Sequence, residues 1–227
     1  MKELFPYFIA STLLIVVVWL IYKPLNIRAI AGIYGGFWVL TATLGQWFKQ
    51  PGRATAGFIG MSVAHVGVAV FLIAMSMTEH KDIEQDILMS PGVTKQVGGY
   101  DFTFTGVDRV KQENYQAQQG HVEVHRDGRL ITTLNPQKRF YPKQQMPMTE
   151  AAIYVGWTKD IYVSLGEAVN QEGAWAVRIY IKPMIRWMWF GGILMLTGAI
   201  IGLFSARIKR QEDKQRDHVM AQQLKLS

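Results

Sequence analysis

Residues 54–78 read ATAGFIGMSVAHVGVAVFLIAMSMT, and this stretch decides the class of fold. It contains no Asp, Glu, Lys or Arg, and a helix of this length spans the hydrocarbon core of a bilayer, which is roughly 30 Å thick. Three further stretches share this property: residues 5–22, 29–48 and 187–206. The sequence therefore predicts a membrane protein with four transmembrane α-helices.

The remaining residues form one long polar block and a charged tail. We accordingly predict four segments: three transmembrane helices within residues 1–78, an inserted β domain at 79–183, a fourth transmembrane helix at 184–206 and a cytoplasmic tail at 207–227. The tail is rich in Gln and in charged residues, and we expect a frayed helix or disorder there.

The polar block carries the signals of an all-β domain. Residues 101–105 and 121–125 alternate polar and apolar side chains. Asp127 and Gly128 precede another such run, at residues 130–134, and this dipeptide is a strong hairpin signal. We predict a small barrel or sandwich, in which residues 135–149 form a long polar connection.

Positive charge next to the membrane helices sets the expected orientation. Residues 207–210 (RIKR) follow the last apolar stretch, which places the C-terminus in the cytoplasm and the polar block on the outer side. Lys49 and Arg53 then lie inside, in agreement with the rule. Lys23 and Arg28 fall in an outer loop and run against it.

The composition excludes several kinds of chemistry. The chain has no cysteine, so it has no thiol nucleophile and no Cys-ligated zinc or iron–sulfur cluster. The net charge is +7, but the basic residues are scattered through loops and the tail, so we do not expect nucleic acid as a partner. Redox or metal chemistry would therefore depend on histidine or a bound cofactor.

His65 is the most informative single residue. It lies twelve residues after Arg53 and fourteen before Glu79, which places it near the middle of a membrane helix. An ionisable side chain at that depth is costly and is a functional candidate by default. Small residues surround it, namely Ser62, Ala69, Gly60 and Gly67, and they leave room for a flat ring or for a closely packed helix.

Two interpretations of His65 stay open from the residues alone. A neutral imidazole is a good axial ligand for heme iron, so His65 is a candidate heme ligand. The alternative is a histidine that forms a hydrogen bond with a neighbouring helix, with or without proton transfer. One histidine cannot supply both axial positions, and the four apolar stretches contain no second one.

The other candidate residues lie outside the apolar stretches. Arg178, Lys182 and Arg186 precede the last membrane helix, where they either extend toward lipid headgroups or pair with the propionates of a heme. His121 and His125 share one strand face but are roughly 13 Å apart, too far to hold one ion together, so we expect a solvated face there. His80 is expected at the membrane interface and His218 in solvent.

Four motifs carry a resemblance to a known family. They are residues 60–70 (GMSVAHVGVAV), 148–153 (MTEAAI), 159–167 (KDIYVSLGE) and 173–183 (GAWAVRIYIKP), the last followed by Arg186 and Trp187. In order and spacing, from about residue 27 to 210, the chain closely resembles the C-terminal part of the CcmF/NrfE family of cytochrome c-type biogenesis proteins.

The resemblance implies a role in cytochrome c maturation in the bacterial inner membrane, with the β domain in the periplasm. Members of this family attach heme to the CxxCH thiols of apocytochrome c. They receive heme from the chaperone CcmE and work with CcmH and CcmI. They also hold a structural heme b among their transmembrane helices, and by motif match His65 resembles one of its two axial ligands.

The family's upstream features have no counterpart in this sequence. These are the tryptophan-rich WWD segment, its two flanking periplasmic histidines and the other heme b ligand. The resemblance therefore implies either a separately encoded subunit of a split heme lyase or a truncated product. We expect that the chain needs the upstream portion of the lyase and does not attach heme alone.

Two other classes of function stay open. A non-catalytic scaffold of the assembly complex would use the periplasmic domain to dock the heme chaperone or the apocytochrome. A b-type electron-transfer subunit would have a quinone or another electron donor as its partner and no effect on c-type cytochromes.

Overall fold

The computed structural model describes residues 5–22, 25–49, 52, 55–142, 147–170 and 173–226. The chain divides into a helical unit, Met1–His80 with Arg186–Ser227, and a β unit, Lys81–Ile185, compared with the 79–183 predicted for the β domain. Lys23 and Arg53, which contributed to the predicted orientation, lie outside the described residues. The side of the membrane on which each segment lies stays a prediction.

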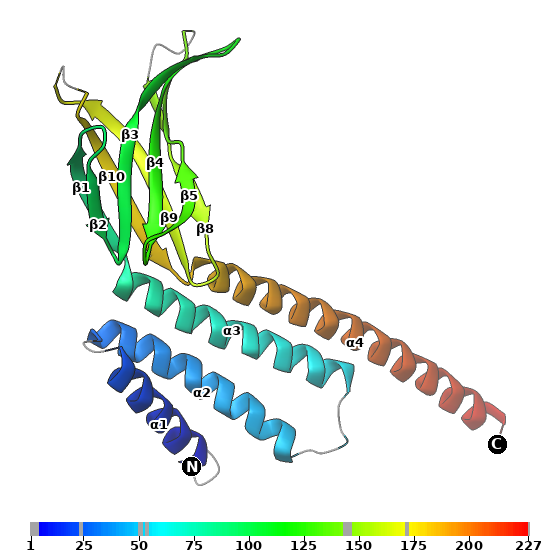
Figure 1. Ribbon diagram of the computed structural model, residues 1–227. Helices are drawn as coiled ribbons and strands as arrows, with labels where there is room; N and C mark the ends of the chain where they lie inside the picture. Colours follow the sequence, from blue (N-terminus) through cyan, green and yellow to red (C-terminus); the bar gives the residue numbers. More distant parts are fainter. Residues whose placement is uncertain are drawn as a thin grey trace. The chain divides into compact units, whose positions relative to one another are not determined.

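The helical unit contains four helices: α1 (Phe5–Ile21), α2 (Ile27–Lys49), α3 (Ala56–Lys81) and α4 (Ile185–Leu226) (Figure 1). By length and composition, α2, α3 and the Ile185–His218 part of α4 can each cross a membrane. Helix α1 is apolar but has only 17 residues, about 26 Å at 1.5 Å per residue. Three candidate spans are therefore supported, and the fourth stays a prediction.

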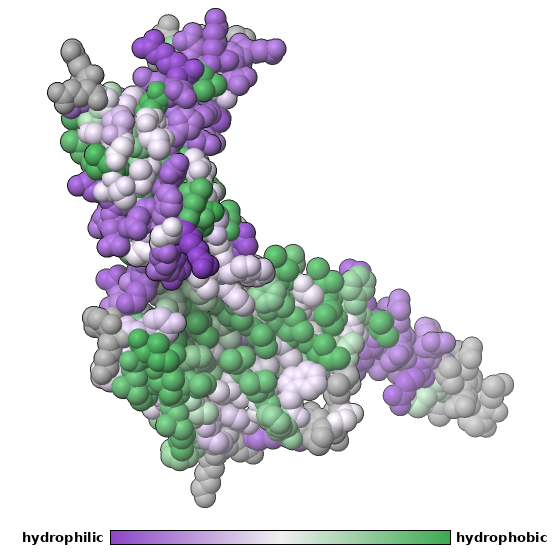
Figure 2. Space-filling model, viewed as in Figure 1, coloured by the Kyte–Doolittle hydropathy of each residue, from purple (hydrophilic) through white to green (hydrophobic). Residues whose placement is uncertain are grey.

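Apolar side chains dominate the surface of this unit on the face shown, up to the charged end of α4 (Figure 2). On α1, Leu13, Val17 and Leu20 are exposed. Exposed apolar side chains on several helices are the pattern of a surface that faces lipid rather than water.

The end of α4 differs from the prediction of a frayed or disordered tail, because the helix continues without a break to Leu226. Residues 203–227 contain neither Gly nor Pro. Gln, Lys, Arg and Glu, which are frequent in this part, have good helix propensity.

Close glycine contacts hold the helices together. On α2, a Cβ at Gly36 would lie 2.6 Å from Cγ1 of Ile73 and 2.9 Å from the backbone oxygen of Ala69 on α3. On α4, a Cβ at Gly198 would lie 2.4 Å from the backbone nitrogen of Ala64. Small residues at such crossings let helices approach closely in a membrane.

The β unit is a sandwich of two antiparallel sheets, which decides between the predicted barrel and sandwich. The four-stranded sheet has the order β1-β10-β9-β8, and the six-stranded sheet has the order β2-β3-β4-β6-β7, with β5 also pairing with β4. The strands are β1 (Ile83–Met89), β2 (Thr94–Val97), β3 (Tyr100–Lys111), β4 (Gln116–Arg126), β5 (Arg129–Leu134), β6 (Gln137–Phe140), β7 (Pro147–Glu150), β8 (Ala152–Val155), β9 (Lys159–Ala168) and β10 (Trp175–Pro183).

Alternation along the strands builds the core between the sheets. Every second residue of the long strands is buried, so that one face of each sheet is apolar. The fully buried side chains include Phe102, Phe104, Val122 and Val124 from one sheet and Ile161, Val163, Leu165, Val177, Ile179 and Ile181 from the other.

The predicted hairpin is confirmed, and the predicted long connection is wrong. Asp127 and Gly128 join β4 to β5 with φ angles of 51° and 74°, as the two central positions of a type I′ turn require. Residues 135–149, by contrast, contain β6 and the start of β7. Both strands form because they extend the sheet beside β4, a pairing that local sequence does not reveal.

Candidate functional site

A cavity of about 580 Å³ lies between α2 and α3 and contains His65 in its wall. The residues that line it repeat at helical spacing: Trp38, Val39, Ala42, Thr43 and Gln46 from α2, and Phe58, Met61 and His65 from α3. Most of these side chains are apolar. The cavity is thus an apolar pocket with a few polar groups, of the size that cofactors occupy.

A hydrogen bond fixes the imidazole of His65. Its Nδ1 lies 2.8 Å from the backbone oxygen of Met61, one turn earlier on α3. A carbonyl oxygen only accepts, so Nδ1–H donates this bond and the proton is absent from Nε2 in the neutral ring. Among the described residues, Nε2 of His65 has no hydrogen-bond partner. In the neutral ring, this geometry leaves the lone pair on Nε2 of a residue that lines an apolar cavity.

Trp47 of α2 contacts two residues of α3, the helix on the other side of this cavity. Its Nε1 donates a hydrogen bond of 3.0 Å to Oγ of Ser62, and Ser62 in turn donates to the backbone oxygen of Phe58. The rings of Trp47 and Phe58 are also packed, with centroids 5.1 Å apart. The hydrogen bond between Trp47 and Ser62 therefore joins α2 to α3.

The small residues around His65 serve helix packing rather than a flat ring. A Cβ at Gly60 would lie 2.7 Å from the backbone nitrogen of Gly202, and one at Gly67 would lie 2.6 Å from that of Met195, both on α4. The sequence left open whether these small residues make room for a flat ring or for a closely packed helix. Gly60 and Gly67 make room for α4. The cavity lies instead on the face of α3 that meets α2.

Arg178 and Lys182 already have carboxylate partners within the β unit. Arg178 donates two hydrogen bonds to Asp86 on the neighbouring strand, of 2.5 and 2.8 Å, and Nζ of Lys182 lies 3.1 Å from Oδ2 of Asp82. The guanidinium of Arg178 holds the pKa of Asp86 below its usual range. A propionate would have to displace these carboxylates. Arg186 lies in the first turn of α4, in the other unit.

In the described residues, the two histidines of β4 lie next to polar and acidic side chains. His121 has both ring nitrogens engaged, Nδ1 at 2.8 Å from Oδ1 of Asn135 and Nε2 at 3.1 Å from Oδ2 of Asp108. His125 lies 4.0 Å from a carboxylate oxygen of Glu123 on its own strand. Across the described parts of the chain, no group of three or more His, Cys, Asp or Glu residues could hold a metal ion.

His80 lies in the last turn of α3, and its buried Nε2 has no hydrogen-bond partner among the described residues. Its predicted position at a membrane interface stays a prediction. His218 lies on α4 and is exposed, although nothing places it relative to a membrane.

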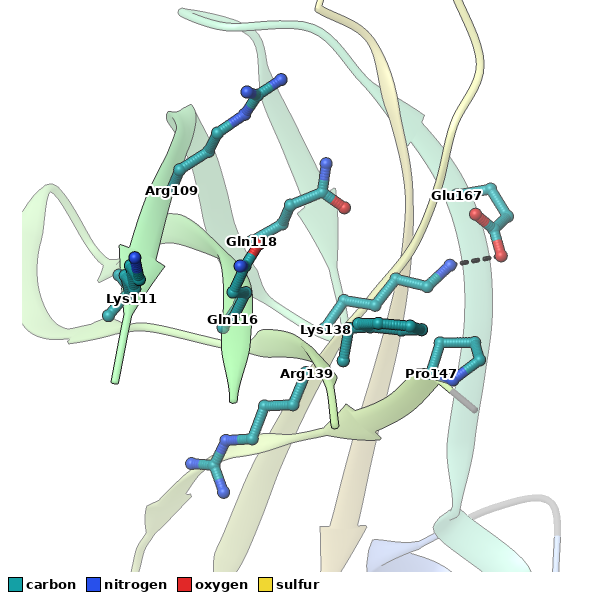
Figure 3. Close-up of a pocket in the computed structure, with 11 residues that line it drawn as sticks. Arg109, Lys111, Gln116, Gln118, Lys138, Arg139, Pro147 and Glu167 are labelled. Atoms are coloured by element: carbon teal, nitrogen blue, oxygen red, sulfur yellow. Dashed lines mark ion pairs between the residues drawn. The ribbon is translucent and has the colours of Figure 1, made fainter. Parts of the chain in front are cut away.

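A second cavity, of about 610 Å³, opens at one end of the sandwich and was not predicted from the sequence. It is bordered by β3, β4, β6, Pro147 of β7 and Glu167 of β9, and four of its eleven lining residues are basic (Figure 3). Arg109, Lys111 and Lys138 belong to it, and Lys138 forms an ion pair with Glu167.

The fold and the first cavity define a helical membrane protein with an inserted β-sandwich and a cavity between α2 and α3 that is lined in part by His65. Residues 80–183 match the family described as the CcmF C-terminal beta-sandwich. The chain is 34% identical over 213 residues to the cytochrome c-type biogenesis protein CcmF of Pseudomonas fluorescens, an alignment that covers 90% of this chain and 32% of the relative. It is 43% identical over 155 residues to CcmF of Pseudomonas aeruginosa, covering 68% of this chain and 23% of the relative.

A solved structure of a cytochrome c heme lyase CcmF has the same fold. The TM-score is 0.70 at 18% identity, and the likeness covers 89% of this chain and 34% of that chain. The chain therefore belongs to the CcmF family of cytochrome c-type biogenesis proteins and corresponds to its C-terminal part. It spans about a third or less of the length of these relatives.

Proposed function

We propose that this chain is the C-terminal portion of a heme lyase that acts in cytochrome c maturation. The proposal places its helices in the bacterial inner membrane and its β domain in the periplasm. It is supported by the family and by relatives that are cytochrome c-type biogenesis proteins. The rest of the lyase would come from the upstream portion of the family protein, because this chain spans only part of its relatives.

The observation that carries the proposal is the presentation of His65 at the cavity between α2 and α3. An axial ligand needs a neutral imidazole with one free nitrogen, and such ligands commonly donate the other N–H to a backbone carbonyl. The bond between Nδ1 of His65 and the backbone oxygen of Met61 is a contact of this kind. Apolar walls from Trp38 and Phe58 suit a flat porphyrin, so the residues present fit a heme.

In this proposal His65 supplies one axial ligand of a heme b, and a histidine of another polypeptide or segment supplies the second. A heme held in this way would provide one-electron chemistry, by which the iron of an incoming heme could be reduced. His65 acts by ligation rather than as an acid or base. The proposed partners are the upstream portion of the lyase, CcmE, CcmH, CcmI and apocytochrome c.

The test is the yield of a c-type cytochrome in cells that lack their own lyase and produce this chain with the upstream portion. We expect His65→Ala to reduce the yield by more than about tenfold, and His80→Ala, on the same helix, to leave it unchanged. Imidazole added to cells with His65→Gly should restore part of the yield, since it can enter the vacated space and ligate iron.

The same cells distinguish the scaffold function. A scaffold predicts a normal yield with His65→Ala and none after deletion of residues 81–185, the β unit. That combination would exclude the ligand role of His65.

A further inference from the structure

Two rows of side chains lie at one end of the β-sandwich, and all but Phe140 are basic or polar where the core pattern would place apolar residues. Arg109 lies opposite Gln118, which lies opposite Lys138, and Lys111 lies opposite Gln116, which lies opposite Phe140. Residues directly opposite in a sheet share a face. We call these six residues, Arg109, Lys111, Gln116, Gln118, Lys138 and Phe140, the basic mouth.

The basic mouth lies on the inner face of the six-stranded sheet. Val107, two residues before Arg109, packs against the core and lies opposite Gly120. A Cβ at Gly120 would lie 3.2 Å from Leu165 of the other sheet. Counting in steps of two from these positions leads to Arg109 and to Gln118, so both continue the face that carries the core.

Glu167 contributes a carboxylate beside Lys138, with its own side chain 82% exposed. It follows buried Leu165 by two residues on β9 and pairs with Lys138, whose side chain is only 14% exposed. Arg139 also borders the cavity but turns to the opposite face (Figure 3), where its guanidinium lies 4.8 Å from the ring of Tyr115. The basic mouth therefore has three cations, on Arg109, Lys111 and Lys138, and the carboxylate of Glu167 lies beside it.

Edge protection does not explain all of these charges. Inward-pointing charges keep the edge strands of a sheet from pairing with other chains. Lys138 lies on β6, which pairs with β4 on one side and with β7 on the other. Arg109 and Lys111 lie where β3 pairs with β4 only, because β2 pairs with residues 100–103 of β3. The positive side chains on this inner face also repel one another, and a negatively charged ligand would reduce that repulsion.

The spacing of the cations indicates the shape of that ligand. Among the described residues, neither Arg109 nor Lys111 has an ion-pair partner. Two positions apart on a strand, they are separated by about 7 Å. Carboxylates on alternate residues of an extended peptide have the same separation. Arg109 and Lys111 are exposed, which suits a chain that passes across the mouth better than a fully enclosed small molecule.

We propose that the basic mouth binds an acidic, extended segment of a partner protein. Carboxylates on alternate residues of the segment pair with Arg109 and Lys111, and the amides of Gln116 and Gln118 donate hydrogen bonds to it. This goes beyond the proposed function and does not depend on His65 or on heme.

The test uses the full chain in detergent and a fluorescein-labelled peptide of alternating glutamate and threonine, with binding measured by fluorescence anisotropy. We expect saturable binding that weakens with salt, and Arg109→Glu should weaken it by about tenfold, because repulsion replaces attraction. Arg129→Glu makes the same change of charge on β5, which pairs with the other end of β4, and should leave the affinity within about twofold.

Three outcomes would overturn the proposal. Equal loss of affinity in Arg109→Glu and Arg129→Glu would mean that only net charge matters. Equal binding of a peptide with its glutamates in one block would show that carboxylates on alternate residues are not required. Displacement by citrate at concentrations where sodium chloride of equal ionic strength has no effect would identify a site for small anions. Lys111→Gln, a milder change, gives a second variant if Arg109→Glu lowers the unfolding temperature.

Discussion

Nδ1 of His65 lies 2.8 Å from the backbone oxygen of Met61, and this one contact determines which nitrogen of the ring can act as a ligand. The carbonyl oxygen requires a proton on Nδ1, so the lone pair is on Nε2. The ring is also held in one orientation before any iron binds, which lowers the entropic cost of ligation.

The bond between Trp47 and Ser62 should stabilise the helices around this cavity. Trp47→Phe retains an aromatic ring near Phe58 but removes the N–H that donates to Ser62. We expect a loss of about 1 kcal/mol of unfolding free energy, which is typical of one buried hydrogen bond. The measurement is thermal unfolding in detergent. Trp189→Phe, at an exposed position on α4, is the control and should have no effect.

The packing of α3 against α4 predicts opposite results for two glycines of α4. A Cβ at Gly198 would lie 2.4 Å from the backbone of Ala64, whereas at Gly202 it would meet open space. Gly198→Ala should therefore cost about 1–3 kcal/mol by overpacking. Gly202→Ala should be neutral or stabilise the helix by up to about 1 kcal/mol. Unfolding temperatures that fall equally in both variants would refute this account of the helix contact.

The pair of Asp86 and Arg178 predicts a dependence on pH. The guanidinium lowers the pKa of Asp86 from its ordinary value of 3.8. A carboxyl with a depressed folded-state pKa stabilises the fold above its unfolded pKa, and this stabilisation is lost as the pH falls through the folded pKa. The contribution of Asp86 is thus full at neutral pH and disappears below 3.8.

Asp86→Asn removes this contribution, so its unfolding temperature should fall less than that of the native chain as the pH decreases from about 5 to about 2. Glu113→Gln removes an exposed carboxylate elsewhere in the β unit and should follow the native curve. Parallel curves for the native chain and Asp86→Asn would show that the pair is not coupled to folding.

Much of the fold could be predicted because its signals are local. Long runs without charge indicated the membrane helices, and Asp127 with Gly128 indicated the turn between β4 and β5. Strands β6 and β7 could not be predicted in this way. Gln137, Lys138 and Arg139 show no alternation of apolar and polar side chains, and they form a strand because β4 offers them hydrogen bonds.

The basic mouth was missed for a physical reason that lies in Gly106. The β3–β4 register shifts between Phe104 and Gly106, whose φ of 147° is a conformation that favours glycine. Simple alternation from Phe104 would place Arg109 on the outer face. The bulge moves it to the inner face instead, and an irregular glycine within an alternating strand is the only signal of this shift in the sequence.

His65 could be named as a candidate from the sequence, but its surroundings could not be predicted. An ionisable residue in an apolar stretch is conspicuous, and its cost in a membrane makes it a candidate wherever it occurs. Which face of α3 meets which helix depends on tertiary packing. The glycines around His65 turned out to contact α4, and the cavity lies toward Trp38 and Gln46 of α2.

The most direct test of the central claim is a reduced-minus-oxidised visible spectrum of the chain purified in detergent together with the upstream portion of the lyase. We predict a b-type heme signal that is absent when the chain is purified alone, is lost with His65→Ala and persists with His80→Ala. A b-type signal of unchanged position and intensity in the His65→Ala complex would contradict the assignment of His65 as a heme ligand.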